Sequence, residues 1–281
     1  MKRKTSNVRV IKETCIAGLT IDHVIKVPSG NHKGRRAKKV NPSNEAVKKN
    51  NDRIAVRNLT RLINANFGIG SSLFTLTYRV IPEMKELKKN IEAFIKKVRR
   101  RLPKLKYIFV CGLHGRPHFH ILMNTENITL VKALWNHGDI VSVKPLDSSG
   151  NYKKLAEYLI GNTKDSFREK TSPFKQRYSC SRNLVRPTIY REIVDISNLY
   201  EEPVPIKGYY IDKDSIRRYE HPVTGIEHLE YMEVALNKPR KRWGRGEIVK
   251  PEKPVKEMYY EQLNLLIADS LDVTEVEYDY N

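Results

Sequence analysis

The stretch GRPHFHILM, residues 115–123, decides the fold and the chemistry that we expect of this chain. It is short and apolar, it contains residues that favour strands, and it carries two histidines two positions apart. Side chains alternate between the two faces of a strand, so His118 and His120 share one face while Phe119 and Ile121 share the other. Two imidazoles that point the same way from a rigid strand form half of a site for a divalent metal ion.

The sequence around this strand predicts an α+β domain. Short runs of β-branched and aromatic residues indicate strands, and apolar residues at steps of three and four indicate helices, as at Leu87, Ile91 and Phe94. The predicted elements in chain order are a strand at 73–78, a helix from about 82 to 102, a strand at 107–111, the histidine strand, a helix at 128–136, a strand at 139–143 and a helix from about 151 to 160 that ends at Gly161. This order predicts a ferredoxin-like (split βαβ) fold, in which an antiparallel-rich sheet carries helices on one face.

Composition divides the chain into four parts. Residues 1–44 are a β-prone extension that ends in a basic loop. Residues 45–187 form the main domain and begin with a helix that has a basic face. Residues 188–236 are expected to add strands or to close that domain. Residues 237–281 are a basic linker and an acidic tail, in which no Lys or Arg follows Lys256.

The charge balance points to a polyanionic partner. The chain has 52 Lys and Arg against 32 Asp and Glu, a net charge of +20, which favours nucleic acid over an anionic membrane surface. Cys15, Cys111 and Cys180 lie far apart in the sequence, which argues against a C-x-x-C zinc ribbon and favours a reducing compartment. No apolar run reaches the roughly 20 residues that a membrane-spanning helix needs. We therefore expect a cytoplasmic protein with no membrane partner.

Three motifs in this order carry a resemblance to a known family. They are FTLTY at 74–78, GRPHFH at 115–120 and a tyrosine on a later helix, in YKKLAEY at 152–158. Together they resemble the His-hydrophobe-His (HUH) endonucleases, and more narrowly the rolling-circle replication initiators of bacterial plasmids and phages. The segments NANF at 64–67 and SRNL at 181–184 are similar to the same subgroup. The resemblance covers roughly residues 45–187, which would be the endonuclease domain.

The resemblance implies a metal-dependent enzyme that nicks and rejoins single-stranded DNA at a specific site. His118 and His120 would bind Mg²⁺ or Mn²⁺, and the metal would polarise the scissile phosphate. A tyrosine hydroxyl would attack the phosphorus, stay bonded to the 5′ side as a phosphotyrosine and free a 3′-OH that primes synthesis. The implied partner is single-stranded or hairpin origin DNA. A host helicase is a further candidate partner, because the chain has no P-loop of its own.

The same resemblance assigns the nucleophile. Tyr158 matches the family's Leu-Ala-x-Tyr helix, and Tyr152 is the alternative. Six residues on a helix correspond to a rotation that leaves the two tyrosines about 120° apart, so they do not form an equivalent pair. Lys154 lies four residues before Tyr158, on the same helix face, and is a candidate to hold the phosphate or to stabilise the phenolate.

The third metal ligand is the main departure from the family pattern. Relatives usually supply an acid before the histidine strand, whereas this chain has Leu113 at the matching place. His114 and Glu157 are the candidates to replace that acid. A site with two imidazoles alone binds Mg²⁺ weakly, because Mg²⁺ prefers oxygen ligands. Either the ligand comes from elsewhere in the chain, or the site favours Mn²⁺, or the activity is impaired.

Several basic and aromatic residues are candidates to contact DNA. They are Arg116, Arg182, Arg240, Arg242 and Trp243, the last of which could stack on an unpaired base. Two other functions stay open from the sequence. One is a conjugative relaxase or single-tyrosine transposase with the same chemistry. The other is a non-catalytic nucleic-acid-binding protein, since the ferredoxin-like sheet is also an RNA-recognition scaffold.

Overall fold

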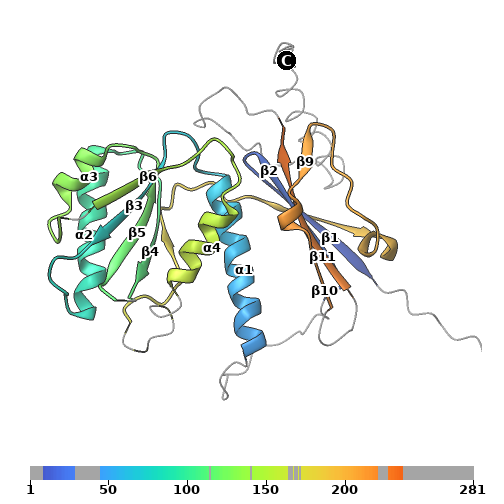
Figure 1. Ribbon diagram of the computed structural model, residues 1–281, viewed down its shortest axis with the longest axis horizontal. Coiled ribbons are helices and arrows are strands. Elements are labelled where there is room, and N and C mark those ends of the chain that lie inside the picture. The colour runs from blue at the N-terminus through green and yellow to red at the C-terminus, as the bar shows by residue number, and fades with distance from the viewer. Residues whose placement is uncertain are drawn as a thin grey trace, which may run out of the picture. The chain divides into compact units, whose positions relative to one another are not determined.

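A computed structural model (Figure 1) describes residues 9–28, 45–113, 115–139, 141–163, 167, 170, 172–220 and 227–236. The chain divides into two compact units, one from Val40 to Arg186 and one made of Met1–Lys39 with Pro187–Asn281. The basic loop of the N-terminal extension, the basic linker and the acidic tail lie outside the described residues. No helix in the described ranges is long and apolar enough to cross a membrane.

The unit Val40–Arg186 contains the histidine strand. Its sheet has the strand order β6-β3-β5-β4-β7, and all neighbouring strands are antiparallel. The strands are β3 (Ser72–Thr77), β4 (Tyr107–Gly112), β5 (His118–Met123), β6 (Val141–Pro145) and β7 (Ser179–Cys180). The helices are α1 (Glu45–Asn64), α2 (Met84–Arg101), α3 (Ile128–Leu134) and α4 (Lys153–Asn162). The predicted α+β class is confirmed, and β5, the histidine strand, lies in the middle of the sheet.

Helices cover both faces of this sheet, which corrects the prediction of helices on one face. Phe119 and Ile121 of β5 lie in one core cluster with residues of α2 and α3, while Leu122 lies in another with residues of α1 and α4. Figure 1 shows these two helix pairs on opposite sides of the sheet. The physical reason is the alternation of the strands, because each face carries apolar side chains that must be buried.

The end of α4 also differs from the prediction. Gly161 does not end the helix, which continues to Asn162 and has Thr163 as its C-cap residue. Gly161 has no positive φ, whereas a C-cap glycine commonly adopts one. The Thr163 hydroxyl donates instead to the carbonyl of Ile160 at 2.7 Å and satisfies one of the last free carbonyls.

The second unit is built around another antiparallel sheet, with the order β10-β11-β2-β1-β8 and β9 paired to β11. Its strands are β1 (Val10–Ala17), β2 (Thr20–Lys26), β8 (Ile189–Val194), β9 (Tyr209–Ile211), β10 (Arg217–Glu220) and β11 (Glu227–Ala235). Two short 3₁₀ turns, η1 (Ile196–Leu199) and η2 (Lys213–Ser215), accompany them. The strands of the N-terminal extension therefore pair with strands that follow residue 187, a partnership that the sequence did not predict.

Candidate active site

The two histidines of β5 lie on the face that α1 and α4 cover. Their ring centroids are 4.8 Å apart, and His118 is half-buried while His120 is buried. The Nδ1–H of His118 donates to the carbonyl oxygen of Arg116 at 2.9 Å, since a carbonyl can only accept. This hydrogen bond fixes the tautomer of His118 and leaves a lone pair on its Nε2.

Thr75 holds the ring of His120. It is the cross-strand partner of His120 on β3, and its Oγ1 lies 3.0 Å from the Nδ1 of that ring. Sequence reasoning did not assign Thr75 to the site. The available signal was the alternation along β3, where Thr75 and Thr77 are the polar residues that share a face, next to the two histidines.

Tyr158 of α4 meets the other side of the His120 ring. Its hydroxyl oxygen lies 3.0 Å from His120 Nε2, and the two ring centroids are 5.0 Å apart. The helix buries Ala156, Leu159 and Ile160, and this leaves Tyr158 at the edge with 50% of its surface exposed. Its hydroxyl is therefore within reach of both a histidine and an incoming ligand.

Tyr152, the alternative nucleophile, has a different environment. It is the N-cap residue of α4, it is buried in the core beside α1, and its hydroxyl donates to the carbonyl oxygen of Asp147 at 2.7 Å. Burial raises the pKa of Tyr152 to about 12, and the nearby Asp147 carboxylate adds to the shift. The structure thus brings Tyr158 to the histidine strand and gives Tyr152 a packing role.

His120 is neutral near pH 7. Burial, reinforced by the neighbouring His118, lowers its pKa to about 4, and a hydrogen bond with the Asn162 side chain opposes this shift. A neutral ring has one donor and one acceptor nitrogen. Because the hydroxyl of Tyr158 can donate to Nε2, the Nδ1–H is then free to donate to Thr75.

Asn162 is a second residue that sequence reasoning did not assign to the site. It lies four residues after Tyr158, its Nδ2 donates to the Tyr158 carbonyl at 2.8 Å, and its side chain hydrogen-bonds to His120. The i, i+4 spacing on a helix was the signal that could have identified it.

Gly112 makes room for the ring of His118. The two residues are cross-strand partners on β4 and β5. A Cβ added at Gly112 would lie 2.5 Å from His118 Nε2 and 2.6 Å from its Cε1, closer than real Cβ atoms approach such groups. Any other residue at this position would displace the imidazole.

The remaining candidates for the metal and nucleophile sites do not join this cluster. No three His, Cys, Asp or Glu side chains come together as a metal-binding group in the described ranges, so Glu157, which is exposed, does not complete the set. Lys154 is exposed one turn before Tyr158. Leu113 packs against the core on the α2 side. His114 lies outside the described residues.

The candidate DNA contacts fall in different places. Arg116 is exposed next to the histidine strand, and its Nη1 donates to the carbonyl of Tyr78 at 3.4 Å. Arg182 is exposed just after β7. Arg240, Arg242 and Trp243 lie outside the described residues.

Comparison with known proteins gives one family. Neither the curated proteins nor the solved structures contain a significant match to this chain. Residues 71–164, which run from the start of β3 past the end of α4, match the ORF2 family of replication-associated proteins. The matched segment contains both histidines of β5 and Tyr158, so this part of the chain is similar to replication-associated proteins, as a replication initiator would be.

Proposed function

We propose that this protein initiates rolling-circle replication by nicking and rejoining single-stranded DNA through Tyr158. The observation that carries the proposal is the 3.0 Å contact between the Tyr158 hydroxyl and His120 Nε2, within the segment that matches replication-associated proteins. A nucleophile held by hydrogen bond to a base, which a third group orients in turn, is the arrangement that activates a hydroxyl. Thr75 is that third group.

The histidines fit a divalent cation. In metal sites the ring nitrogen that does not bind the metal usually donates to a protein oxygen. The Nδ1 atoms of His118 and His120 lie 2.9 Å from the Arg116 carbonyl and 3.0 Å from the Thr75 hydroxyl, so each Nε2 is the atom that would bind Mg²⁺ or Mn²⁺. Such a cation would supply charge stabilisation at the oxygens of the scissile phosphate. DNA phosphate and water would provide the oxygen ligands that this pair of imidazoles lacks.

The chain's own groups account for the covalent step. The Oη of Tyr158 forms a bond to phosphorus while the bond from phosphorus to the 3′ oxygen breaks, which leaves a 5′-phosphotyrosine and a free 3′-OH. His120 Nε2, which is neutral at pH 7, holds the hydroxyl proton before the reaction. Nε2 cannot accept this proton and bind a cation at the same time, so loading the site releases the hydroxyl towards the phosphate. Attack by the 3′-OH on the phosphotyrosine reverses the reaction and rejoins the strand.

Covalent capture of DNA tests the proposal. The protein is incubated with single-stranded origin DNA and Mn²⁺, and the protein–DNA adduct is resolved on a denaturing gel. We expect an adduct that Tyr158→Phe abolishes and that Tyr152→Phe, the matched control, retains. An adduct that persists in Tyr158→Phe and disappears in Tyr152→Phe would show that the nucleophile is misassigned. Binding without any metal-dependent nicking on a panel of single-stranded DNAs would favour the non-catalytic alternative.

A further inference from the structure

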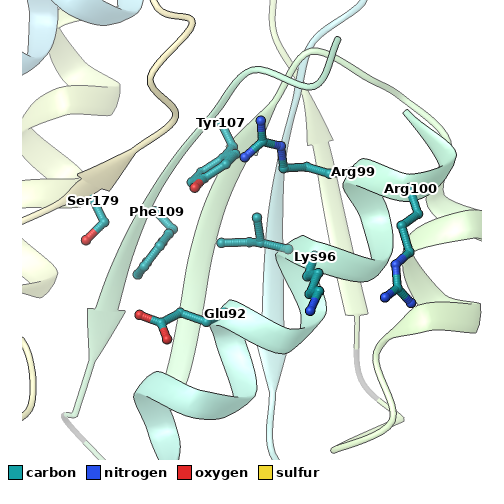
Figure 2. A pocket seen from close by; sticks show the side chains of 8 residues that line it. Glu92, Lys96, Arg99, Arg100, Tyr107, Phe109 and Ser179 are labelled. Atoms are coloured by element: carbon teal, nitrogen blue, oxygen red, sulfur yellow. The ribbon is translucent and has the colours of Figure 1, made fainter. Parts of the chain in front are cut away.

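A groove lies on the other side of the same sheet, between the C-terminal half of α2 and the start of β4 (Figure 2). Its volume is about 580 Å³, within the range of sites that bind small ligands. Its lining residues are Glu92, Ile95, Lys96, Arg99, Arg100, Tyr107, Phe109 and Ser179. Nothing in the proposed nicking reaction uses this groove.

Strand alternation separates the groove from the candidate active site. Phe109 belongs to the core cluster on the α2 side, and Tyr107 packs against that cluster. Val110, the cross-strand partner of His120, lies in the core beside α1 and α4. Tyr107 and Phe109 therefore face away from the histidines, and a ligand in the groove cannot contact Tyr158 directly.

One wall of the groove is strongly basic. The last two turns of α2 carry five cations, and no acid follows Glu92 in the helix. Among the described residues, no carboxylate forms an ion pair with Lys96, Arg99 or Arg100, and all three are exposed. These charges are available to an external anion.

The opposite wall is aromatic. The rings of Tyr107 and Phe109 are stacked, with centroids 6.3 Å apart and an interplanar angle of 21°. Figure 2 shows the guanidinium of Arg99 beside the ring of Tyr107, and the carboxylate of Glu92 towards the end where Phe109 lies. Burial raises the pKa of Tyr107, and the positive charges of Arg99 and Arg182 oppose this shift, which agrees with two cations close to its hydroxyl.

We infer that this groove binds an unpaired nucleotide segment, with a base against the ring of Tyr107 and its phosphates on Arg99 and Arg100. Aromatic rings next to cations are the combination that binds single strands without base pairing. The groove favours a nucleotide over an acidic peptide, because Glu92 would repel a carboxylate but can accept a hydrogen bond from a base amine. The inference extends the proposed function, since it gives a second segment of the same DNA a place on the protein, but binding here does not depend on nicking.

Binding measurements with full-length protein test the groove. The background is Tyr158→Phe, which cannot form an adduct, and the probe is a short fluorescein-labelled oligothymidylate followed by anisotropy at several salt concentrations. In Arg99→Gln/Arg100→Gln the loss of two phosphate contacts should reduce the magnitude of the salt slope by about 1.4, from about 0.7 per contact on single strands. Lys85→Gln/Lys89→Gln, with the same charge change at the start of α2, should leave the slope nearly unchanged.

The aromatic contact has its own variants. Tyr107→Leu should weaken oligothymidylate binding about tenfold, whereas Tyr107→Phe keeps the ring and should bind normally. An oligomer that carries 5-iododeoxyuridine should crosslink to Tyr107 on irradiation, as mapped by mass spectrometry. Thermal unfolding verifies that each variant is folded.

Three results would overturn the inference. The first is an equal loss of binding in both charge variants, which would reflect net charge alone. The second is a crosslink that maps elsewhere, with no effect of Tyr107→Leu. The third is a loss of binding to labelled poly-glutamate, but not to oligothymidylate, in Arg99→Gln/Arg100→Gln, which would assign the groove to an acidic protein partner. Absence of the nicking adduct in wild-type protein, with these binding effects intact, would reject the proposed function and leave the groove assignment standing.

Discussion

At the scale of single residues, the site depends on how Thr75 orients His120. Replacing Thr75 by Val removes the hydroxyl and keeps the branched shape, so the ring loses the partner of its Nδ1. Residues that support a metal-binding histidine typically contribute 10- to 100-fold to metal affinity or activity. We expect Thr75→Val to slow adduct formation by roughly that factor while the protein stays folded, as measured in single-turnover assays.

Thr77→Val is the matched control for this prediction. Thr77 lies on the same face of β3 and pairs with His118, whose Nδ1 is bonded to the Arg116 carbonyl instead. We expect little change in rate from this variant. Equal losses in Thr75→Val and Thr77→Val would mean that the polar face of β3 matters as a whole and that the hydrogen bond to His120 does not.

Gly112 tests the position of the other imidazole. In Gly112→Ala the new Cβ meets the far end of the His118 side chain, so the ring must turn away while the backbone can stay. We expect the Mn²⁺ concentration that gives half-maximal nicking to rise roughly tenfold, the lower end of the effect of such supporting positions. Circular dichroism should be unchanged. An unaltered metal requirement would show that His118 does not hold the cation where it now lies.

The low pKa of His120 makes stability depend on pH. The unfolded ring takes up a proton below about 6.5, whereas the folded ring does so only below about 4, so stability falls as the pH falls through that window. The full effect of this one group is about 3 kcal/mol. We expect wild-type protein in EDTA to lose more unfolding free energy than His120→Gln between pH 7 and pH 5 in urea titrations. Parallel losses would contradict a neutral, buried ring.

At the scale of elements, sequence pattern was sufficient for the central part of the sheet. The apolar alternation of 73–78 and 107–123 and the spacing of Leu87, Ile91 and Phe94 predicted β3, β4, β5 and α2 within a few residues. Local patterns record which face of an element is apolar, and this is what those segments needed. The same logic placed His118 and His120 on one face before the structure was known.

Contacts between distant segments were beyond this reasoning. The sequence did not show that α1 and α4 cover the second face, or that Thr75 stands opposite His120, because both follow from register and packing across the sheet. The pairing of β1 with β8 joins residues nearly the whole described chain apart, and no local pattern encodes it. Local glycine chemistry misled at Gly161, where the next residues continued the helix.

Gly161 gives a prediction for α4. It has helical conformation, and a Cβ built on it meets no atom within 4 Å. Ala is more favourable than Gly inside a helix by about 0.5–1 kcal/mol, so Gly161→Ala should raise the melting temperature by a few degrees and leave nicking unchanged. Differential scanning calorimetry measures the shift. A loss of activity with normal stability would mean that DNA approaches the helix backbone at this position.

At the scale of the whole molecule, the question is which unit carries the chemistry. Both core clusters beside the histidine sheet are made only of residues between Val40 and Arg186. His118, His120, Thr75 and Tyr158 lie in the same continuous segment, which includes the part that matches replication-associated proteins. A segment with its own hydrophobic core and no required strand from outside should fold alone.

We therefore expect residues 40–186, expressed alone, to unfold cooperatively and to form the Mn²⁺-dependent adduct with single-stranded DNA. The rate at saturating DNA should stay within a fewfold of the full chain, because every group that contacts Tyr158 or the histidines is retained. Affinity is expected to fall where cations outside the segment neutralise DNA phosphates, and the salt slope measures how many do. A folded segment that binds DNA but forms no adduct would mean that the sheet of β1, β2, β8 and β11 contributes a group to the reaction, and adding that second unit in trans would then restore it.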